Sequence, residues 1–228
     1  MADPPLVIEY GEAALLVVLG DRVDPSVNAR VYRIAARLLA DGGAGPGLGR
    51  PVPAYASLLV PFDPERIEAA AARRAVEEVL ADPAVSEPGP EAGPGAAGDR
   101  APIEIPVRYG GSDGPDLDEV AARLGRSVDE IVALHTAPVY RVFMIGFSPG
   151  FPYLGPLPSE LELPRRAEPR SRVPAGSVAI AGRQTGIYPT ESPGGWHLIG
   201  RTGERLWDPA ADPPSRLDPG DLVRFVAT

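Results

Sequence analysis

Residues 82–101 read DPAVSEPGPEAGPGAAGDRA and contain almost no large hydrophobic side chain. A segment of this composition cannot bury enough apolar surface to offset the entropy lost when it is ordered. We therefore predict a flexible linker, rich in Pro, Gly and Ala, over residues 82–101. It divides the chain into an N-terminal domain, residues 1–81, and a larger C-terminal domain, residues 102–228.

The N-terminal domain has the pattern of a small α+β fold. Residues 6–11 and 14–20 are short β-branched and leucine-rich runs that predict two strands. A helix with hydrophobic residues on one face is expected to begin near Asp24, and a third strand to cover residues 55–62. Asp63, which precedes a proline, has the position of an N-cap for a second helix. This order predicts helices on one face of an antiparallel sheet.

The C-terminal domain begins with a predicted strand and two short helices. Asp116 and Glu119 form the pattern of one capping box, and Ser127 and Glu130 form that of another. From Tyr140 onward, helical periodicity gives way to short β-branched and aromatic runs separated by Pro and Gly. This pattern predicts a mainly-β domain built as a closed barrel of short strands.

Composition excludes several kinds of chemistry. The chain has no cysteine, and because lysine is also absent, all 22 basic residues are arginines. A thiolate nucleophile, a Schiff-base lysine and a phosphate-binding loop of the GxxxxGK[ST] type are therefore impossible. With 2 histidines and no cysteine, we expect no metal site.

Charge and hydropathy indicate the cellular setting. The net charge of −9 argues against a nucleic-acid partner, which would need a basic face. Because no apolar run approaches the length that spans a bilayer and the N-terminus lacks the features of a secretory signal, we expect no membrane association and a cytoplasmic location.

The segment GFSPGFPYLG is the first candidate for a functional site. Phe147 and Phe151 flank a type II turn, in which Pro149 takes the second position and Gly150 the third. Such a turn displays aromatic rings from a stiff scaffold. The alternative is a hydrophobic plug that closes one end of the barrel.

Residues 182–203 form a second candidate cluster. It holds Gln184, Tyr188 and Trp196 among glycines that allow a ligand to approach the backbone closely. Gly194 and Gly195 could present successive N–H groups to an anion. Alternatively, the glycines make a barrel corner, and the tryptophan packs in the core.

Arginines and a histidine complete the candidates. The prolines around Arg165, Arg166, Arg170 and Arg172 keep the chain extended, so these side chains should point to different sides, and one of them could bind a carboxylate or phosphate. A solvated loop or a contact with another protein chain is the alternative. His135 lies at the end of a predicted helix, where its protonated form would be stabilised; a cap or packing role is the alternative.

Three long segments resemble one known family. HTAPVYRVFMIGFSPGFPYLG, PRRAEPRSRVPAGSVAIAGRQTGIYP and SPGGWHLIGRT are similar to the family of 5-oxoprolinase B subunits, also called KipI or allophanate hydrolase subunit 1. The resemblance extends to IEIPVRYGG, GPDLDEVAARLG and YASLLVPFDP, so it covers nearly the whole chain except the predicted linker.

The resemblance implies a cyclophilin-like barrel as the C-terminal domain. It also implies one component of an enzyme, inactive or nearly so alone, that acts with C and A subunits to open 5-oxoproline, a lactam, to glutamate with ATP and Mg²⁺. These partners would hold most of the nucleotide. Two alternatives remain: a regulatory inhibitor that binds a sensor histidine kinase, and a component of a urea carboxylase or allophanate-type enzyme that processes amides. Fold likeness by itself does not decide between these functions.

The resemblance also suggests roles for residues. His135, Gln184 and Tyr188 are the expected catalytic residues, with His135 transferring a proton and the other two orienting the amide. The expected substrate-binding residues are Tyr140, Phe147, Pro149, Gly150, Phe151, Arg165, Arg170, Ser192, Gly194, Gly195 and Trp196.

Overall fold

The protein is described by a computed structural model that covers residues 5–21, 23–40, 47–86 and 101–228. Contacts group the chain into two compact units, one within residues 1–96 and one within residues 97–228. Each unit has a hydrophobic core of its own. The domain boundaries at residues 81 and 102 stay a prediction.

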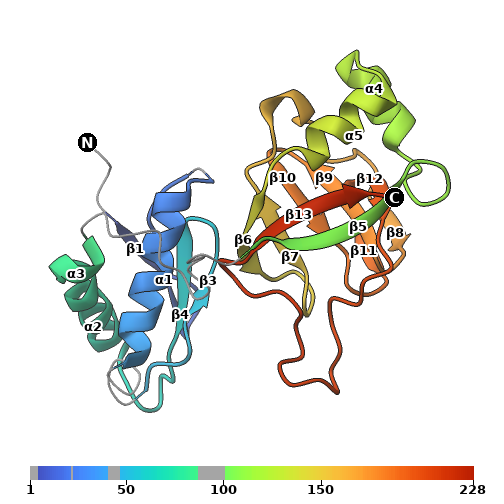
Figure 1. The fold of residues 1–228 in the computed structure, drawn as a ribbon. Coiled ribbons are helices and arrows are strands. Elements are labelled where there is room, and N and C mark those ends of the chain that lie inside the picture. Colours follow the sequence, from blue (N-terminus) through green and yellow to red (C-terminus); the bar gives the residue numbers. More distant parts are fainter. Residues whose placement is uncertain (1–4, 22, 41–46, 87–100) are drawn as a thin grey trace. The chain divides into compact units, whose positions relative to one another are not determined.

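The first unit is a four-stranded antiparallel sheet with helices on one face (Figure 1). Its strands follow the order β1-β2-β4-β3 across the sheet. The side chains of Leu15 and Leu58 point from β2 and β4 onto Ile34 and Val76, and all four are fully buried. The elements are β1 (Leu6–Glu9), β2 (Ala14–Val18), α1 (Pro25–Ala40), β3 (Val52–Pro53), β4 (Ser57–Pro61), α2 (Ala69–Ala81) and α3 (Pro83–Ser86).

Two details of the first unit correct the sequence predictions. Asp63 does not cap a helix: its side chain accepts a hydrogen bond from the N–H of Glu65 within a turn, and α2 begins later, at Ala69. Within the predicted linker, Pro83–Ser86 forms helix α3 and Val85 is buried in the core of this unit, while the bounds of the linker stay a prediction. Residues 87–100 of that predicted linker lie outside the described residues.

The second unit is mainly β, as predicted. Among the described residues, seven strands close into a barrel in the order β10-β7-β6-β13-β5-β12-β9, and β8 pairs with β11 in a separate two-stranded sheet. Helices α4 and α5 pack together beside the barrel and contribute to its core (Figure 1). The elements are β5 (Ile103–Tyr109), α4 (Leu117–Leu124), α5 (Val128–Thr136), β6 (Tyr140–Ile145), β7 (Pro152–Gly155), the 3-10 helix η1 (Ser159–Leu161), β8 (Arg170–Val173), β9 (Ser177–Ala181), β10 (Gln184–Ile187), β11 (Ser192–Gly194), β12 (His197–Arg201) and β13 (Leu222–Ala227).

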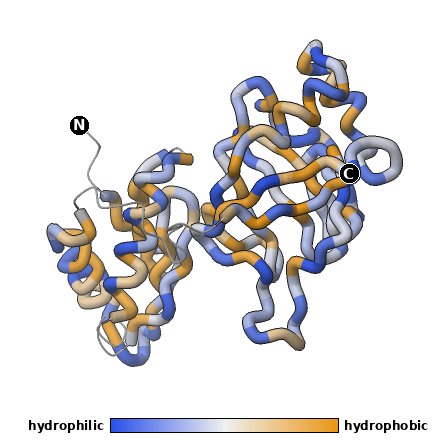
Figure 2. The backbone as a smooth tube through the Cα atoms, viewed as in Figure 1, coloured by the Kyte–Doolittle hydropathy of each residue, from blue (hydrophilic) through white to orange (hydrophobic). Residues whose placement is uncertain are grey.

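The barrel wall separates two hydrophobic clusters. Because side chains alternate along a strand, Val178 and Ile180 of β9 point into the main barrel core, whereas Ala179 and Ala181 point outward into a second cluster. Hydrophobic and hydrophilic residues alternate in the same way along β5 (Figure 2). The outer cluster includes aromatic residues of both candidate segments, so the fold itself brings these segments together.

Candidate functional site

The segment that contains Phe147 makes two consecutive turns. The N–H of Phe151 donates to the carbonyl of Ser148 at 3.1 Å, and Gly150 has a φ of 77°, which confirms the type II turn. Just before it, the N–H of Ser148 donates to the carbonyl of Gly146 at 2.7 Å around Phe147, whose φ is 65°. This γ-turn is rare for a residue with a side chain and is strained.

The two phenylalanines of this segment have different surroundings. Phe147 is 62% exposed, whereas Phe151 is buried. The ring of Phe151 makes edge-to-face contacts with Tyr153, Tyr188 and Trp196, at centroid distances of 4.9, 5.1 and 5.7 Å. The rings are thus held by packing against one another, which fixes the shape of the surface they form.

These rings line a small pocket of about 160 Å³, which we call the aromatic pocket. It unites residues from both candidate segments and from the arginine-rich segment between them. Its lining consists of Phe147, Phe151, Tyr153, Arg165, Arg166, Pro169, Tyr188, Gly194, Gly195 and Trp196. The sequence did not predict a pocket role for Tyr153, Arg166 and Pro169, although all three lie within the segments that suggested the site; the other lining residues were expected.

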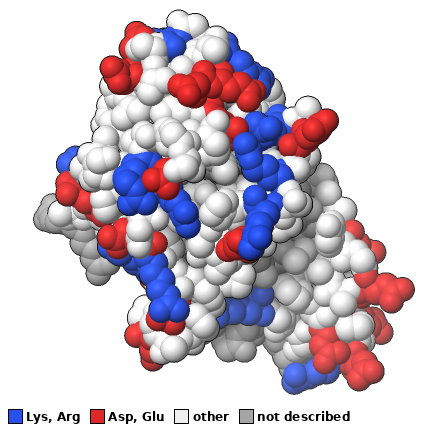
Figure 3. Space-filling model, turned by 90° about the vertical axis from the view of Figure 1, so that its right-hand side faces the viewer, with Lys and Arg blue, Asp and Glu red and all other residues white. Residues whose placement is uncertain are grey.

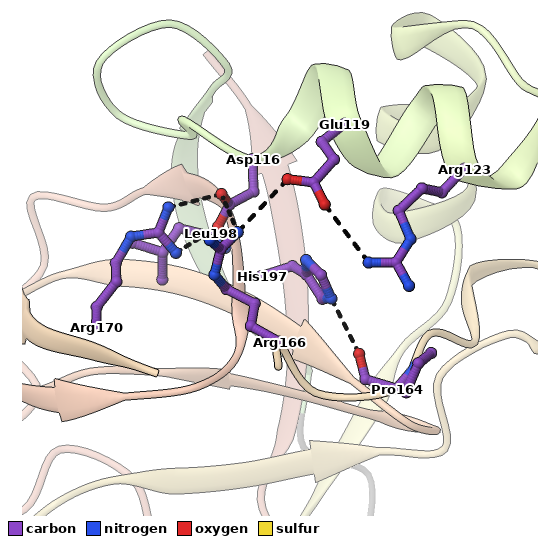
Figure 4. Close-up of polar contacts among 8 residues, drawn as sticks. All are labelled: Asp116, Glu119, Arg123, Pro164, Arg166, Arg170, His197 and Leu198. Atoms are coloured by element: carbon purple, nitrogen blue, oxygen red, sulfur yellow. Dashed lines mark hydrogen bonds and ion pairs between the residues drawn. The ribbon is translucent and has the colours of Figure 1, made fainter. Parts of the chain in front are cut away.

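The arginines near the pocket have distinct roles. Arg170 donates two hydrogen bonds to the carboxylate of Asp116, at 2.7 and 2.8 Å, and Arg166 donates a third at 3.0 Å (Figure 4). Arg165, in contrast, is exposed and has no ion pair or hydrogen bond among the described residues. Arg165 therefore lines the pocket with a guanidinium that no described residue neutralises, whereas Arg170 is bonded to Asp116 and does not line the pocket. The substrate-binding roles of both arginines stay predictions.

Asp116 does not form the capping box that the sequence predicted at the start of α4. It stands at the N-cap position of α4, but its side chain caps no helical N–H. It accepts instead from the two arginines and from the N–H of Leu198 in β12, at 2.7 Å. A carboxylate that is buried needs such donors more than an exposed cap does, because it has lost its water. Ser127 and Glu130, by comparison, form the predicted capping box at α5.

Charges around the barrel are interspersed. Figure 3 shows both arginine and carboxylate side chains on one face of the molecule. The prediction that extended, proline-rich backbone directs neighbouring arginines to different sides is wrong for Arg166 and Arg170, because both side chains reach the same carboxylate of Asp116. The aromatic pocket has a local positive charge in an otherwise acidic protein.

Tyr188 is a wall of the pocket. Burial raises the pKa of its phenol. A Cβ atom on Gly194 would lie 2.2 Å from that hydroxyl oxygen, so only glycine fits above the ring. A Cβ atom added to Gly195 would lie 3.6 Å from Pro169, which is an ordinary van der Waals distance.

His135 and Tyr140 lie elsewhere, inside the barrel. Both nitrogens of His135 are bonded: Nδ1 to the hydroxyl of Tyr109 at 2.7 Å and Nε2 to that of Thr185 at 2.9 Å. Because Thr185 donates its own proton to the carbonyl of Ala179, its oxygen accepts from Nε2–H, and Nδ1 accepts from Tyr109. The hydroxyl of Tyr140 donates to the backbone carbonyl of His135.

The environment of His135 does not support proton transfer at the pocket. Burial lowers its pKa to about 3, which outweighs the stabilising effect of the helix C-terminus that the sequence suggested. The ring is fully buried and stacks on Phe225 at a centroid distance of 4.6 Å. These contacts favour the packing alternative for His135, and its catalytic role stays a prediction.

Four other expected residues do not line the pocket. Pro149 and Gly150 shape the turn behind it, and a Cβ on Gly150 would come within 2.8 Å of Trp207. Gln184 is the first residue of β10, paired with Ala181, and Ser192 pairs with Val173 in the outer sheet.

A larger groove of about 720 Å³ is a weaker candidate. It is lined by Arg108 and Arg205, which pair with Asp113 and Asp208 at 2.8 and 2.9 Å. Its surface is shallow and its charges are largely matched. The aromatic pocket has the concave, mostly apolar walls and the single free charge that small-molecule sites usually have.

No group of three or more histidine, aspartate or glutamate side chains in the described part of the chain is arranged to hold a metal ion. No helix within the described residues is long and apolar enough to cross a membrane.

Two curated proteins are close in sequence, and both carry the name of the 5-oxoprolinase B subunit. The chain is 44% identical to the protein of this name from Escherichia coli O157:H7, over 95% of this chain and 93% of that protein. It is 40% identical to the one from Bacillus subtilis strain 168, over 96% of this chain and 90% of that protein.

Solved structures share the fold. The protein TTHA0988, whose crystal structure has been solved, is 41% identical in sequence to this chain, and the two structures have a TM-score of 0.75. The match covers 94% of this chain and 40% of the longer TTHA0988 chain. The urea carboxylase of Kluyveromyces lactis has a TM-score of 0.78 at 20% identity, over 98% of this chain and 22% of that one. At that identity the likeness concerns the fold alone.

A comparison with protein-family models agrees with the curated relatives and with the solved structures. The model for "Carboxyltransferase domain, subdomain C and D" matches residues 5–217, which is nearly the whole chain. With its aromatic pocket, its barrel and these relatives, the chain belongs to the carboxyltransferase-domain family of subdomains C and D, among the proteins named as B subunits of 5-oxoprolinase.

Proposed function

We propose that this chain is the B subunit of an ATP-dependent 5-oxoprolinase, which acts with the C and A subunits to open 5-oxoproline to glutamate. The observation that carries the proposal is the aromatic pocket of about 160 Å³ with the unpaired Arg165 on its wall. The names of the relatives support it. We further propose that the barrel is cyclophilin-like and that the complex is cytoplasmic.

The pocket suits a small lactam that carries a carboxylate. The five-membered ring of 5-oxoproline is compact and largely apolar, so it can pack against the rings of Phe151 and Trp196. Its carboxylate would pair with the guanidinium of Arg165, which offers several donors in a planar fork. Phe147, Tyr153 and Tyr188 would exclude water from the remaining sides.

The reaction needs ATP because a lactam is a stable amide. Phosphorylation of the carbonyl oxygen activates the ring carbon, and water adds to that carbon. The tetrahedral adduct then breaks its C–N bond as the nitrogen takes up a proton, and a second water hydrolyses the resulting glutamyl phosphate to glutamate and phosphate. In this proposal the partner subunits hold most of the nucleotide with its Mg²⁺. This chain binds the substrate and fixes its orientation, which lowers the entropic part of the barrier.

The lining of the pocket also explains why the chain would be inactive alone. It contains no histidine, aspartate or glutamate among its described residues. Burial raises the pKa of the Tyr188 phenol, so it serves as a wall and not as a base. A partner would therefore supply the proton transfers.

Co-expression tests the proposal. This chain is produced with the 5-oxoprolinase A and C subunits of its own genome, and 5-oxoproline-dependent ATP hydrolysis and glutamate release are measured. We expect activity only when all three are present. A stable complex that turns over another amide, but not 5-oxoproline, would contradict the proposed substrate.

The exposed Phe147 favours one second function. A ring that is 62% exposed and held on a strained turn is typical of a protein contact. The alternative is a regulatory protein that binds a sensor histidine kinase through this ring. It requires the chain alone to bind such a kinase, and loss of that binding in Phe147→Ala.

A further inference from the structure

The groove of about 720 Å³ brings two like charges directly opposite each other. Arg108 in β5 and Arg201 in β12 are cross-strand partners in an antiparallel pair, and both line the groove. Residues paired in this way lie on the same face of the sheet with Cβ atoms about 4.5–5.5 Å apart, and like charges there destabilise the sheet. An anion bound between the two guanidiniums would remove this repulsion.

Arg201 carries the unbalanced charge of this pair. Its Nε donates to the carbonyl of Ala175, another lining residue, at 2.9 Å, and this bond fixes the guanidinium. Its two terminal nitrogens have no hydrogen-bond or ion-pair partner among the described residues, and they are open to solvent. A fixed guanidinium with accessible donors is preorganised to bind an oxyanion.

The other four charged residues that line the groove have ion-pair partners outside its lining. The pairs are Arg108 with Asp113, Arg205 with Asp208, Glu191 with Arg172, and Glu204 with Arg216. The side chains of Arg108 and Arg205 are 57% and 70% exposed, so their ion pairs are weak and can be exchanged for a bound anion. Because each glutamate is held by its own arginine, the glutamates repel that anion little.

An apolar wall lies in the same groove. It is formed by Trp207, Pro189 and Pro209. Trp207 is partly buried and packs against the type II turn, where a Cβ atom on Gly150 would come within 2.8 Å of it. The volume of the groove is within the range of small-molecule sites and far exceeds that of a single small anion. The occupant therefore has an organic part as well as a charge.

We propose that this groove binds a nucleoside phosphate, with a phosphate group between Arg108 and Arg201 and the base against Trp207. A phosphate group carries a charge of about −1.5 to −2, enough to offset two guanidiniums, whereas a carboxylate offsets one. Several charge-assisted hydrogen bonds hold such a group without the enclosure that a small lactam needs. The inference does not depend on the proposed reaction, because it concerns binding by the isolated chain.

The chain offers a direct spectroscopic test, because it has only 2 tryptophans. Trp207 lines the groove, and Trp196 lines the aromatic pocket. Indole ¹⁵N–¹H NMR spectra of the isolated chain are recorded while ADP is added at constant ionic strength. We expect a saturable shift of the Trp207 signal, assigned with Trp207→Phe, and little change at Trp196.

Inorganic phosphate, added in the same way, tests the organic part of the ligand. It should bind at least about tenfold more weakly than ADP, because stacking of a base on an aromatic ring contributes about 1–3 kcal/mol. Equal affinities would mean that the groove recognises free phosphate, and they would overturn the nucleoside assignment. The whole proposal fails if ADP does not shift Trp207 saturably or shifts only Trp196. Neither failure would contradict the oxoprolinase proposal, in which partner subunits hold most of the nucleotide.

Matched variants locate the phosphate group. Arg201→Gln should raise the dissociation constant of ADP about tenfold or more, because it removes charge-assisted hydrogen bonds. Arg183→Gln removes the same charge at an exposed position of the barrel outside the groove lining and should leave that constant nearly unchanged. Equal weakening in both variants would indicate general attraction to the charge of the protein and would overturn the assignment to Arg201.

The stability of the ligand-free chain distinguishes a binding role from a structural one. Arg108→Gln removes the repulsion with Arg201 and loses only an exposed ion pair with Asp113. Its thermal unfolding midpoint should therefore be unchanged or higher, while its affinity for ADP falls. A lower midpoint with unchanged affinity would show that Arg108 serves the fold and not the ligand.

Discussion

Arg170 holds both carboxylate oxygens of Asp116 with its two terminal nitrogens, at 2.7 and 2.8 Å. The two residues are far apart in the sequence and join the start of α4 to the start of β8. Asp116 also holds Leu198 in β12, which follows the pocket residue Trp196 closely in the chain. The ion pair therefore supports the arginine-rich wall of the aromatic pocket and the strand beside it.

Removing the charge of Asp116 should destabilise the second unit strongly. Asp116→Asn leaves two partly buried guanidiniums without their shared anion, and breaking a buried ion pair typically costs about 3–5 kcal/mol. Urea unfolding of the isolated chain measures the loss. Asp118→Asn, at an exposed position in the first turn of α4, is the control and should cost little. A loss of only about 1 kcal/mol in Asp116→Asn would be that of an ordinary helix cap.

Arg165 should affect substrate binding without affecting stability. In the assembled complex, Arg165→Gln should raise the KM for 5-oxoproline by about tenfold or more, because a charge-assisted hydrogen bond contributes about 1.5–3 kcal/mol. Its unfolding midpoint should match that of the unaltered chain, since Arg165 has no hydrogen-bond or ion-pair partner among the described residues. An unchanged KM would place the carboxylate elsewhere. Arg170→Gln, in contrast, should lower stability because it breaks the pair with Asp116.

Acid should destabilise the barrel through His135. Its pKa is lowered from 6.5 to about 3 by burial, so between these values the unfolded chain binds a proton that the folded chain does not. The stabilising contribution is therefore complete above about pH 6.5 and decreases as the pH falls toward 3. The slope is roughly 1.4 kcal/mol per pH unit, so about 2 kcal/mol should be lost between about pH 6.5 and pH 5.

Comparison with a variant isolates this effect from that of the carboxylates. The free energy of unfolding is measured against pH for the unaltered chain and for His135→Gln. The variant should be less stable at neutral pH but should lose less on acidification. Parallel pH curves for the two proteins would show that His135 titrates normally in the folded state.

Two adjacent glycines should respond differently to the same change. Gly194→Ala would place a methyl group 2.2 Å from the hydroxyl oxygen of Tyr188, so the ring or the strand must move. Both stability and the affinity for 5-oxoproline should fall. Gly195→Ala meets only ordinary contacts with Pro169 and should be tolerated. Similar effects in the two variants, measured by thermal unfolding and by the KM of the complex, would contradict the packing described for Tyr188.

Much of the fold follows from local patterns in the sequence. The period of hydrophobic residues is set by backbone geometry, so α1, the strands β1, β2 and β4 of the first unit and the change to short strands after Tyr140 could be predicted. The type II turn at Pro149 and Gly150 followed from the conformations that these two residues favour. The capping box of Ser127 and Glu130 is local in the same sense.

The misplaced predictions share one physical cause. Asp63, Asp116 and His135 each matched a local pattern, but side-chain bonds and burial depend on neighbours that are distant in the sequence. A carboxylate pairs with whichever donors are nearest once the chain has folded, and Asp116 meets Arg166 and Arg170.

The sequence by itself therefore determined which residue types were available: arginine as the basic residue, no thiol, and aromatic rings on stiff turns. Only the tertiary structure decided that Arg170 is neutralised while Arg165 is free, and that His135 lies inside the barrel. The physical reason is that electrostatic and desolvation energies depend on distances through space, which residue spacing along the chain does not specify.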